Sequence, residues 1–96
     1  MVDVSALSEA VAKFKENPYW AKYLNEAPSD KSKEFIKYNF YYSTIDDDDK
    51  DIDEVVEKLD SFEDELGLED WKYLLKYNKG NQFGEICKEK IKELSE

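Results

Sequence analysis

Hydrophobic residues recur every three or four positions along most of the chain, which places them on one face of successive α-helices. The first such pattern consists of Val4, Leu7, Val11 and Phe14. It predicts a helix that begins near Asp3 or Ser5, residue types that cap helix N-termini. Asn17 followed by Pro18 predicts a break and a restart, because asparagine is a frequent N-cap and proline suits the first helical position. Pro28 ends this second helix.

The third predicted helix begins at Ser29 or Asp30 and is aromatic on most of its sides. Its apolar face comprises Phe35, Ile36, Asn39 and Phe40, widened by Tyr38, Tyr41 and Tyr42. A helix with apolar residues around most of its circumference is expected to run through the middle of a domain. A strand over 38–45 would also suit these residue types, but no second strand is available to pair with it.

The clearest helical pattern of the chain follows an acidic loop at 45–51. Its members are Ile52, Val55, Val56, Leu59, Phe62 and Leu66. Asp51 and Glu54 have the spacing of a capping box, with Asp51 as the capping residue. Gly67 suits the left-handed residue that closes many helices. These two features predict the start and the end of the fourth helix.

Two further helical patterns complete the chain. The first contains Leu68, Trp71, Leu74 and Leu75 and ends at Gly80; the second contains Phe83, Ile86, Cys87, Ile91 and Leu94. We expect Cys87 to pack in the core rather than react, because it lies on the apolar face. The sequence therefore predicts an all-α fold: one compact domain over residues 1–96, made of five to six short helices in a bundle-like, orthogonal packing.

The negative charge of the chain is concentrated in one window. The net charge is −10, and residues 45–70 contain fourteen acids and two lysines, whereas the flanking parts are nearly neutral. A surface of one sign acts over roughly a Debye length, ~10 Å at 0.1 M salt, and attracts partners of the opposite sign. We expect a basic protein partner to dock on this acidic face and on neighbouring tyrosines. The candidate partner-binding residues are Asp47, Asp53, Glu54, Glu57, Asp64, Tyr73 and Tyr77.

Three residue types set limits on the chemistry. The chain has no histidine and no arginine, so the usual general base and the bidentate anion-binding side chain are both missing. Cys87, the single cysteine, can form neither an internal disulfide nor a zinc site, and it is compatible with a reducing compartment. We therefore predict a non-enzymatic protein with no catalytic residues and no cofactor.

Other sequence patterns predict where the protein is located and whether it binds nucleic acid directly. No apolar run is long enough for a membrane span, and the start of the chain lacks the pattern of a secretory signal, so we expect a cytoplasmic protein without membrane contact. The lysines are scattered among acids, which disfavours direct binding to nucleic acid.

Alternative functions stay open at this point. The acidic residues suit a nucleic-acid-mimicking inhibitor or an immunity-type protein, by analogy with other small acidic helical proteins. A weak divalent-cation site is another alternative, with Asp46, Asp48, Asp49 and Asp51 as candidate ligands. The loop does not match an EF-hand, because a register starting at Asp46 places a lysine among the ligands and lacks the required glycine. Aromatic residues left unburied would indicate a homodimer.

Overall fold

Six α-helices contain most of the residues that the structure, a computed structural model, describes: residues 4–45 and 51–95. In chain order they are α1 (Val4–Lys15), α2 (Pro18–Asn25), α3 (Asp30–Thr44), α4 (Ile52–Glu65), α5 (Leu68–Asn78) and α6 (Gln82–Ser95). No strand occurs within these ranges. The predicted all-α, single-domain fold is confirmed.

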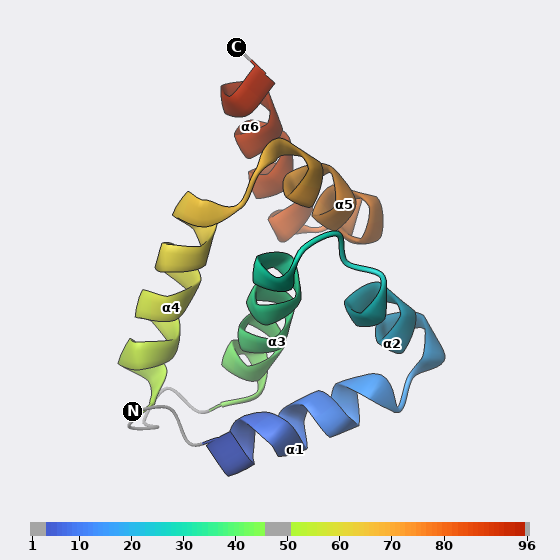
Figure 1. Ribbon diagram of the computed structural model, residues 1–96, viewed down its shortest axis with the longest axis vertical. Helices are drawn as coiled ribbons and strands as arrows, with labels where there is room; N and C mark the ends of the chain where they lie inside the picture. The colour runs from blue at the N-terminus through green and yellow to red at the C-terminus, as the bar shows by residue number, and fades with distance from the viewer. Residues whose placement is uncertain (1–3, 46–50, 96) are drawn as a thin grey trace.

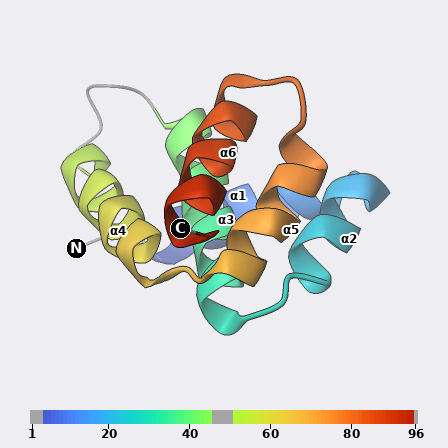
Figure 2. The same cartoon turned by 90° about the horizontal axis from the view of Figure 1, so that it is seen from above.

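Helix α3 lies in the middle of the molecule, as its aromatic sequence predicts (Figures 1 and 2). It packs against α1, α2 and α4, while α5 and α6 pack mainly against each other. In both views α4 and α2 lie on opposite sides of α3. The surfaces of α4 and α2 that face away from α3 are therefore well separated.

The principal core joins the α5–α6 pair to α3. Its most completely buried members are Phe35 of α3, Trp71 and Leu74 of α5, and Cys87 of α6. A second, smaller cluster around Val55 connects α4 to α1 and to the C-terminal part of α3. The predicted packing of Cys87 is confirmed, since its side chain is fully buried. None of the six helices is long and apolar enough to cross a membrane.

Two predicted helix starts are confirmed in detail. The side-chain oxygen of Asn17 accepts a hydrogen bond from the Tyr19 backbone N–H at 2.9 Å, with Pro18 at the first helical position. Ser29 caps α3 in a reciprocal arrangement, in which its hydroxyl oxygen accepts from the Ser32 N–H and the Ser32 hydroxyl oxygen accepts from the Ser29 N–H, both at 3.1 Å. These caps satisfy N–H groups that have no partner within the helix.

The predicted ends of α4 are confirmed in position, with Asp51 as the N-cap and Glu65 as the last helical residue, but the capping contacts predicted there are wrong. Asp51 precedes α4 but its side chain makes no capping hydrogen bond, so the predicted capping box with Glu54 does not form. Gly67 does not close α4 in a left-handed conformation; its backbone is extended (φ −92°, ψ 177°), and it is the N-cap of α5. Ser5 lies inside α1 rather than at its start, and Asp3 is outside the described residues. The left-handed glycine is Gly80, between α5 and α6, with φ 89°.

Candidate functional site

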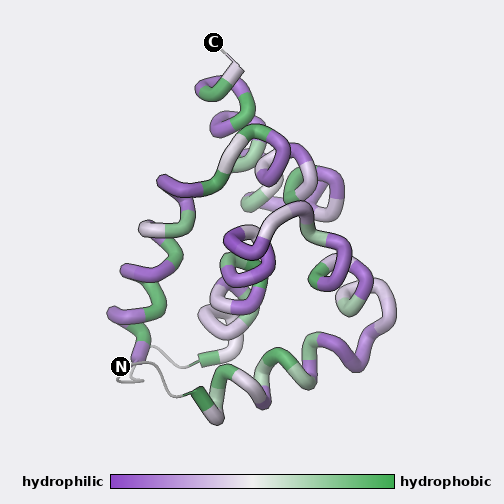
Figure 3. Tube along the Cα trace, viewed as in Figure 1, coloured by the Kyte–Doolittle hydropathy of each residue, from purple (hydrophilic) through white to green (hydrophobic). Residues whose placement is uncertain are grey.

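Four acidic side chains form a continuous row on the outer face of α4. Asp53, Glu57, Asp60 and Asp64 are all exposed, and they follow one another at spacings of four, three and four positions. This spacing keeps the row on one side of the helix over ~16 Å, at 1.5 Å per residue. We call these residues the acidic stripe. Figure 3 shows α4 with hydrophilic residues along its outer side and hydrophobic residues toward α3.

The acidic stripe lacks compensating cations. Among the residues described, none of its members makes an ion pair, although six ion pairs link lysines to other acids. Lys58 belongs to the same helix but lies about 100° or more around the axis from each member of the stripe. Among the described residues, the four carboxylates are therefore not neutralised by ion pairs, and their negative potential extends into solvent.

The structure brings together some of the predicted partner-binding acids and separates others. Asp53, Glu57 and Asp64 belong to the acidic stripe. Glu54 lies on the flank of α4, half-buried, with one carboxylate oxygen fully shielded from solvent. Asp47 lies outside the described residues. Asp60 was missed from the sequence, although its spacing from Glu57 and Asp64 places it on the same side of the helix.

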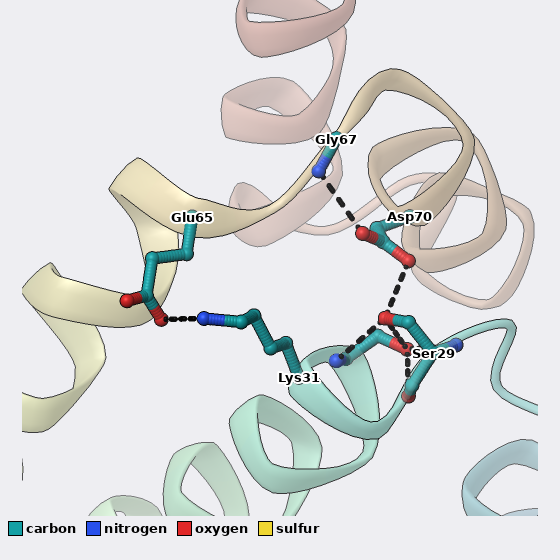
Figure 4. Close-up of polar contacts among 6 residues, drawn as sticks. Ser29, Lys31, Glu65, Gly67 and Asp70 are labelled. Carbon is teal, nitrogen blue, oxygen red and sulfur yellow. Dashed lines mark hydrogen bonds and ion pairs between the residues drawn. The ribbon is translucent and has the colours of Figure 1, made fainter.

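Two acids of the charged window contact other helices of the fold (Figure 4). Asp70 accepts a hydrogen bond from the Gly67 N–H at 3.0 Å, and it accepts a second from the Ser29 hydroxyl at 2.8 Å. It thus lies between the N-termini of α5 and α3, where a negative charge complements both helix dipoles. Glu65 forms an ion pair of 2.8 Å with Lys31 on the neighbouring helix. These two carboxylates connect elements of the fold and contribute little to a free acidic face.

Glu63 lies on the flank of α4, beside the stripe and near Lys90 of α6. Its side chain is half-buried, and this burial raises the pKa of its carboxyl above the usual 4.5. The nearby carboxylates of Asp60 and Asp64 raise this pKa further, while Lys90 of α6 lowers it. Repulsion from neighbouring carboxylates therefore contributes to the raised pKa of Glu63, but burial is the larger cause.

Tyr73 and Tyr77 lie on the other side of the molecule from the acidic stripe. Both are half-buried in α5 and stack on Tyr23 of α2, at ring-centroid distances of 5.8 and 4.7 Å. The Tyr73 hydroxyl also donates a hydrogen bond to the Tyr23 carbonyl at 2.6 Å. The two tyrosines thus connect α5 to α2. A role for them in partner binding stays a prediction, and the structure does not join them to the acids in one surface.

The proposed cation ligands fall mostly outside the structural description. Asp46, Asp48 and Asp49 are not among the described residues. Asp51 is described, and its carboxylate accepts a long hydrogen bond of 3.4 Å from the Tyr41 hydroxyl. Within residues 4–45 and 51–95, no group of three or more acidic or cysteine side chains is placed to hold a metal ion. Cation binding by the loop stays an untested prediction.

A pocket of about 300 Å³ opens between α1, α2 and α3, beside the end of α5. Its floor is formed by the buried residues Phe14, Tyr23 and Ile36, and its exposed edge by Tyr42 and Ser43. The remaining lining residues are Trp20, Asn39, Phe40 and Asn78. The hydrophobic pattern of the sequence does not reveal this pocket, because the pocket depends on how three helices diverge. The one available signal is Asn39, a polar residue on the apolar face of α3.

Comparisons with known proteins give no relationship for this chain. No protein-family model matches it, and searches of curated proteins and of solved structures found no match. Function is therefore inferred from the charge and geometry described above.

Proposed function

We propose that this protein acts through protein–protein interaction, by docking the acidic stripe of α4 on a positively charged surface of a partner protein. The observation that carries the proposal is the row of four exposed carboxylates without ion pairs to described residues. Such a row focuses a negative potential on one side of the molecule, which speeds encounter with a basic surface and orients it.

The position of the stripe supports a docking role. Its members are not needed for packing, because the opposite face of α4 supplies Val55, Leu59 and Phe62 to the core. Val56, 38% exposed, lies next to the stripe and adds apolar area to the same surface. A surface that combines central apolar contact with surrounding charge is typical of protein interfaces.

A charge-neutral variant of the stripe tests the proposal. Its substitutions are Asp53→Asn, Glu57→Gln, Asp60→Asn and Asp64→Asn. A matched control removes four charges from exposed acids of α1, α6 and the α1–α2 link: Glu9→Gln, Glu16→Gln, Glu89→Gln and Glu93→Gln. Both variants change the net charge from −10 to −6. The probe is a fluorescent octalysine peptide, with binding followed by anisotropy at 50 and 150 mM salt.

We expect the stripe variant to bind octalysine at least about fivefold more weakly than the control, because the four stripe carboxylates lie on one helix face, whereas the four of the control are divided among three segments. Equal loss in both variants would show that net charge alone attracts the peptide, and would contradict the proposal. Affinity capture with the wild type and both variants then identifies partners that the stripe variant alone fails to retain. Association of such a partner should slow steeply with added salt.

A narrower alternative is an inhibitor or immunity-type protein that mimics the charge of nucleic acid. The regular spacing of the acidic stripe favours it, because a row of carboxylates can occupy a groove that binds phosphates. This alternative requires that duplex DNA compete with the protein for the captured partner. A partner that binds both at once contradicts the mimicry and leaves the docking proposal standing.

We also propose a cytoplasmic location and a protein without enzymatic activity or cofactor. The location is supported by Cys87, whose buried free thiol is compatible with a reducing compartment. The absence of histidine supports the proposed lack of enzymatic activity, since the commonest general base is missing.

A second copy of this chain is the alternative to a different protein as the partner. Light scattering distinguishes a homodimer from a monomer.

A further inference from the structure

We propose that the pocket between α1, α2 and α3 binds a small, uncharged, planar nitrogen heterocycle that carries adjacent hydrogen-bond donor and acceptor groups, of which adenine is the representative. The site is separate from the acidic stripe, and the proposal does not depend on it. At about 300 Å³ the pocket lies at the small end of the range for ligand sites, ~300–1,000 Å³, and suits one or two fused rings.

The shape of the lining favours a flat ring. Phe14, Trp20 and Phe40 lie close together, with centroid distances of 5.7 Å from Phe14 to Trp20 and 4.6 Å from Phe14 to Phe40. Together with Tyr23 and Tyr42 they give the pocket five aromatic side chains among nine lining residues. Stacking on aromatic side chains stabilises a bound base. An aliphatic ligand of the same volume lacks this stabilisation.

Asn39 supplies the first polar contact. It lies on the apolar face of α3 and lines the pocket, and its side-chain amide makes no hydrogen bond with any described residue. An asparagine amide offers one acceptor and two donors, and it can pair in a bidentate way with the N6 and N7 edge of adenine. The amide is therefore available to a ligand with a matching edge.

Tyr23 supplies a second, more buried contact. Its side chain is only 5% exposed, and its hydroxyl oxygen accepts a hydrogen bond from the Asn78 amide nitrogen at 3.2 Å. Burial raises the pKa of Tyr23 above its usual 10, so the hydroxyl keeps its proton at neutral pH. No acceptor within the described residues receives that proton. The hydroxyl is therefore available to donate to a ligand acceptor at the floor of the pocket.

The charge of the lining sets the charge of the ligand. None of the nine lining residues is a lysine or an acid, and the whole chain carries a net charge of −10. A phosphate group would therefore meet no compensating cation in the pocket, and it would be repelled by the protein as a whole. This distinguishes a free base or nucleoside from a nucleotide.

The proposal is tested by NMR titration of the full chain with four probes: adenine, purine, adenosine and AMP. Adenine should shift the side-chain amide signals of Asn39 and quench Trp20 fluorescence, and purine, which lacks the amino donor, should bind several-fold more weakly. Adenosine should bind more tightly than AMP, because the two differ by the charged phosphate. Equal affinity for adenine and purine, or tighter binding of AMP, would overturn the proposal.

Two variants locate the site. Asn39→Leu should weaken adenine binding about tenfold, through the loss of two hydrogen bonds. Asn25→Leu, an exposed asparagine at the end of α2, serves as the matched control and should leave binding unchanged. Tyr23→Phe should weaken binding several-fold while circular dichroism still reports a folded protein. No adenine binding to the folded wild type at several millimolar, or equal binding by Asn39→Leu, would refute the site.

Discussion

The carboxylate of Asp70 and the hydroxyl of Ser29 are joined by a hydrogen bond of 2.8 Å, although they lie 41 residues apart in the chain. Because Asp70 also accepts the Gly67 N–H and Ser29 caps α3, this contact joins the N-termini of two helices. One carboxylate thereby complements two helix dipoles. It fixes the α5–α6 pair relative to α3.

Replacement of Asp70 should therefore be costly. Asp70→Ala removes the acceptor for both the Gly67 N–H and the Ser29 hydroxyl, and we expect it to lower the free energy of unfolding by about 1–3 kcal/mol. Asp64→Ala, an exposed acid without an ion pair among the described residues, should change it by less than about 0.5 kcal/mol. Urea unfolding followed by circular dichroism measures both. A cost for Asp70→Ala no larger than that for Asp64→Ala contradicts the bridging role.

The three glycines should differ sharply in their tolerance of alanine. A Cβ at Gly84 would lie 2.1 Å from the Asn78 carbonyl oxygen, so we expect Gly84→Ala to cost about 2–3 kcal/mol. Gly80→Ala should cost about 1 kcal/mol, because its φ of 89° disfavours a side chain. At Gly67 the Cβ would meet only an ordinary contact of 3.9 Å, and the change should stay within about 0.5 kcal/mol. Thermal melts of the three variants measure the order of these stability costs. A Gly67→Ala variant less stable than the other two would contradict the predicted order.

Glu63 should make the stability of the protein depend on pH. Its folded pKa is raised, so the native state binds this proton more tightly than the unfolded chain does. The contribution of Glu63 to the free energy of unfolding should therefore become more favourable to the folded state as the pH falls from 7 toward the usual pKa of 4.5. Glu63→Gln should be more stable than the wild type at pH 7, with a difference that shrinks as the pH falls. Lys90 reduces this expected gain in stability, because Glu63→Gln loses the attraction between the Glu63 carboxylate and the Lys90 ammonium group.

The measurement is the melting temperature of the wild type, Glu63→Gln and Glu57→Gln between pH 7 and 4.5. Glu57 is exposed and serves as the control for a lost charge on α4. A variant less stable than the wild type at pH 7 would mean that the attraction of Glu63 to Lys90 exceeds the burial effect.

Cys87 should react slowly with thiol reagents. Its side chain is fully buried, and burial raises its pKa from 9.0 to about 11, which lowers the thiolate fraction at pH 8 by about a hundredfold. Modification by iodoacetamide should therefore be at least about a hundredfold slower in the native protein than in urea. A Cys87→Ala variant carrying Ser95→Cys, at an exposed position, should react equally in both conditions. Equal native and denatured rates for Cys87 would contradict its packing.

The sequence predicted the helices because each has a local signal. Asn17 and Ser29 were identified as caps from residue type and position, and the structure confirms both. Gly67 was misassigned because glycine is common at both ends of helices, and here it starts α5 instead of closing α4. Asp51 is the N-cap of α4 as predicted, but its side-chain capping hydrogen bond is missing, for a different reason. Its side chain meets the Tyr41 hydroxyl from another helix, which no local pattern reveals.

The candidate site was predictable in part. Periodicity places Asp53, Glu57 and Asp64 on one face, and a stricter use of the same spacing would have added Asp60. The separation of this face from Tyr73 and Tyr77 could not be predicted, because it depends on which side of α3 each helix packs. The pocket beside Asn39 could not be predicted for the same reason, because it depends on how the helices around α3 pack.

The central position of α3 has a thermodynamic consequence. Helix α4, which carries the acidic stripe, lies on one side of α3, and α2, which supplies Trp20 and Tyr23 to the pocket, lies on the other (Figure 2). A partner bound to α4 would leave the pocket uncovered, so both sites can be occupied in one ternary complex. Any cooperativity between them has to be transmitted through α3 or α1, because both helices contact α4 and both line the pocket. Without such transmission, the two binding free energies simply add.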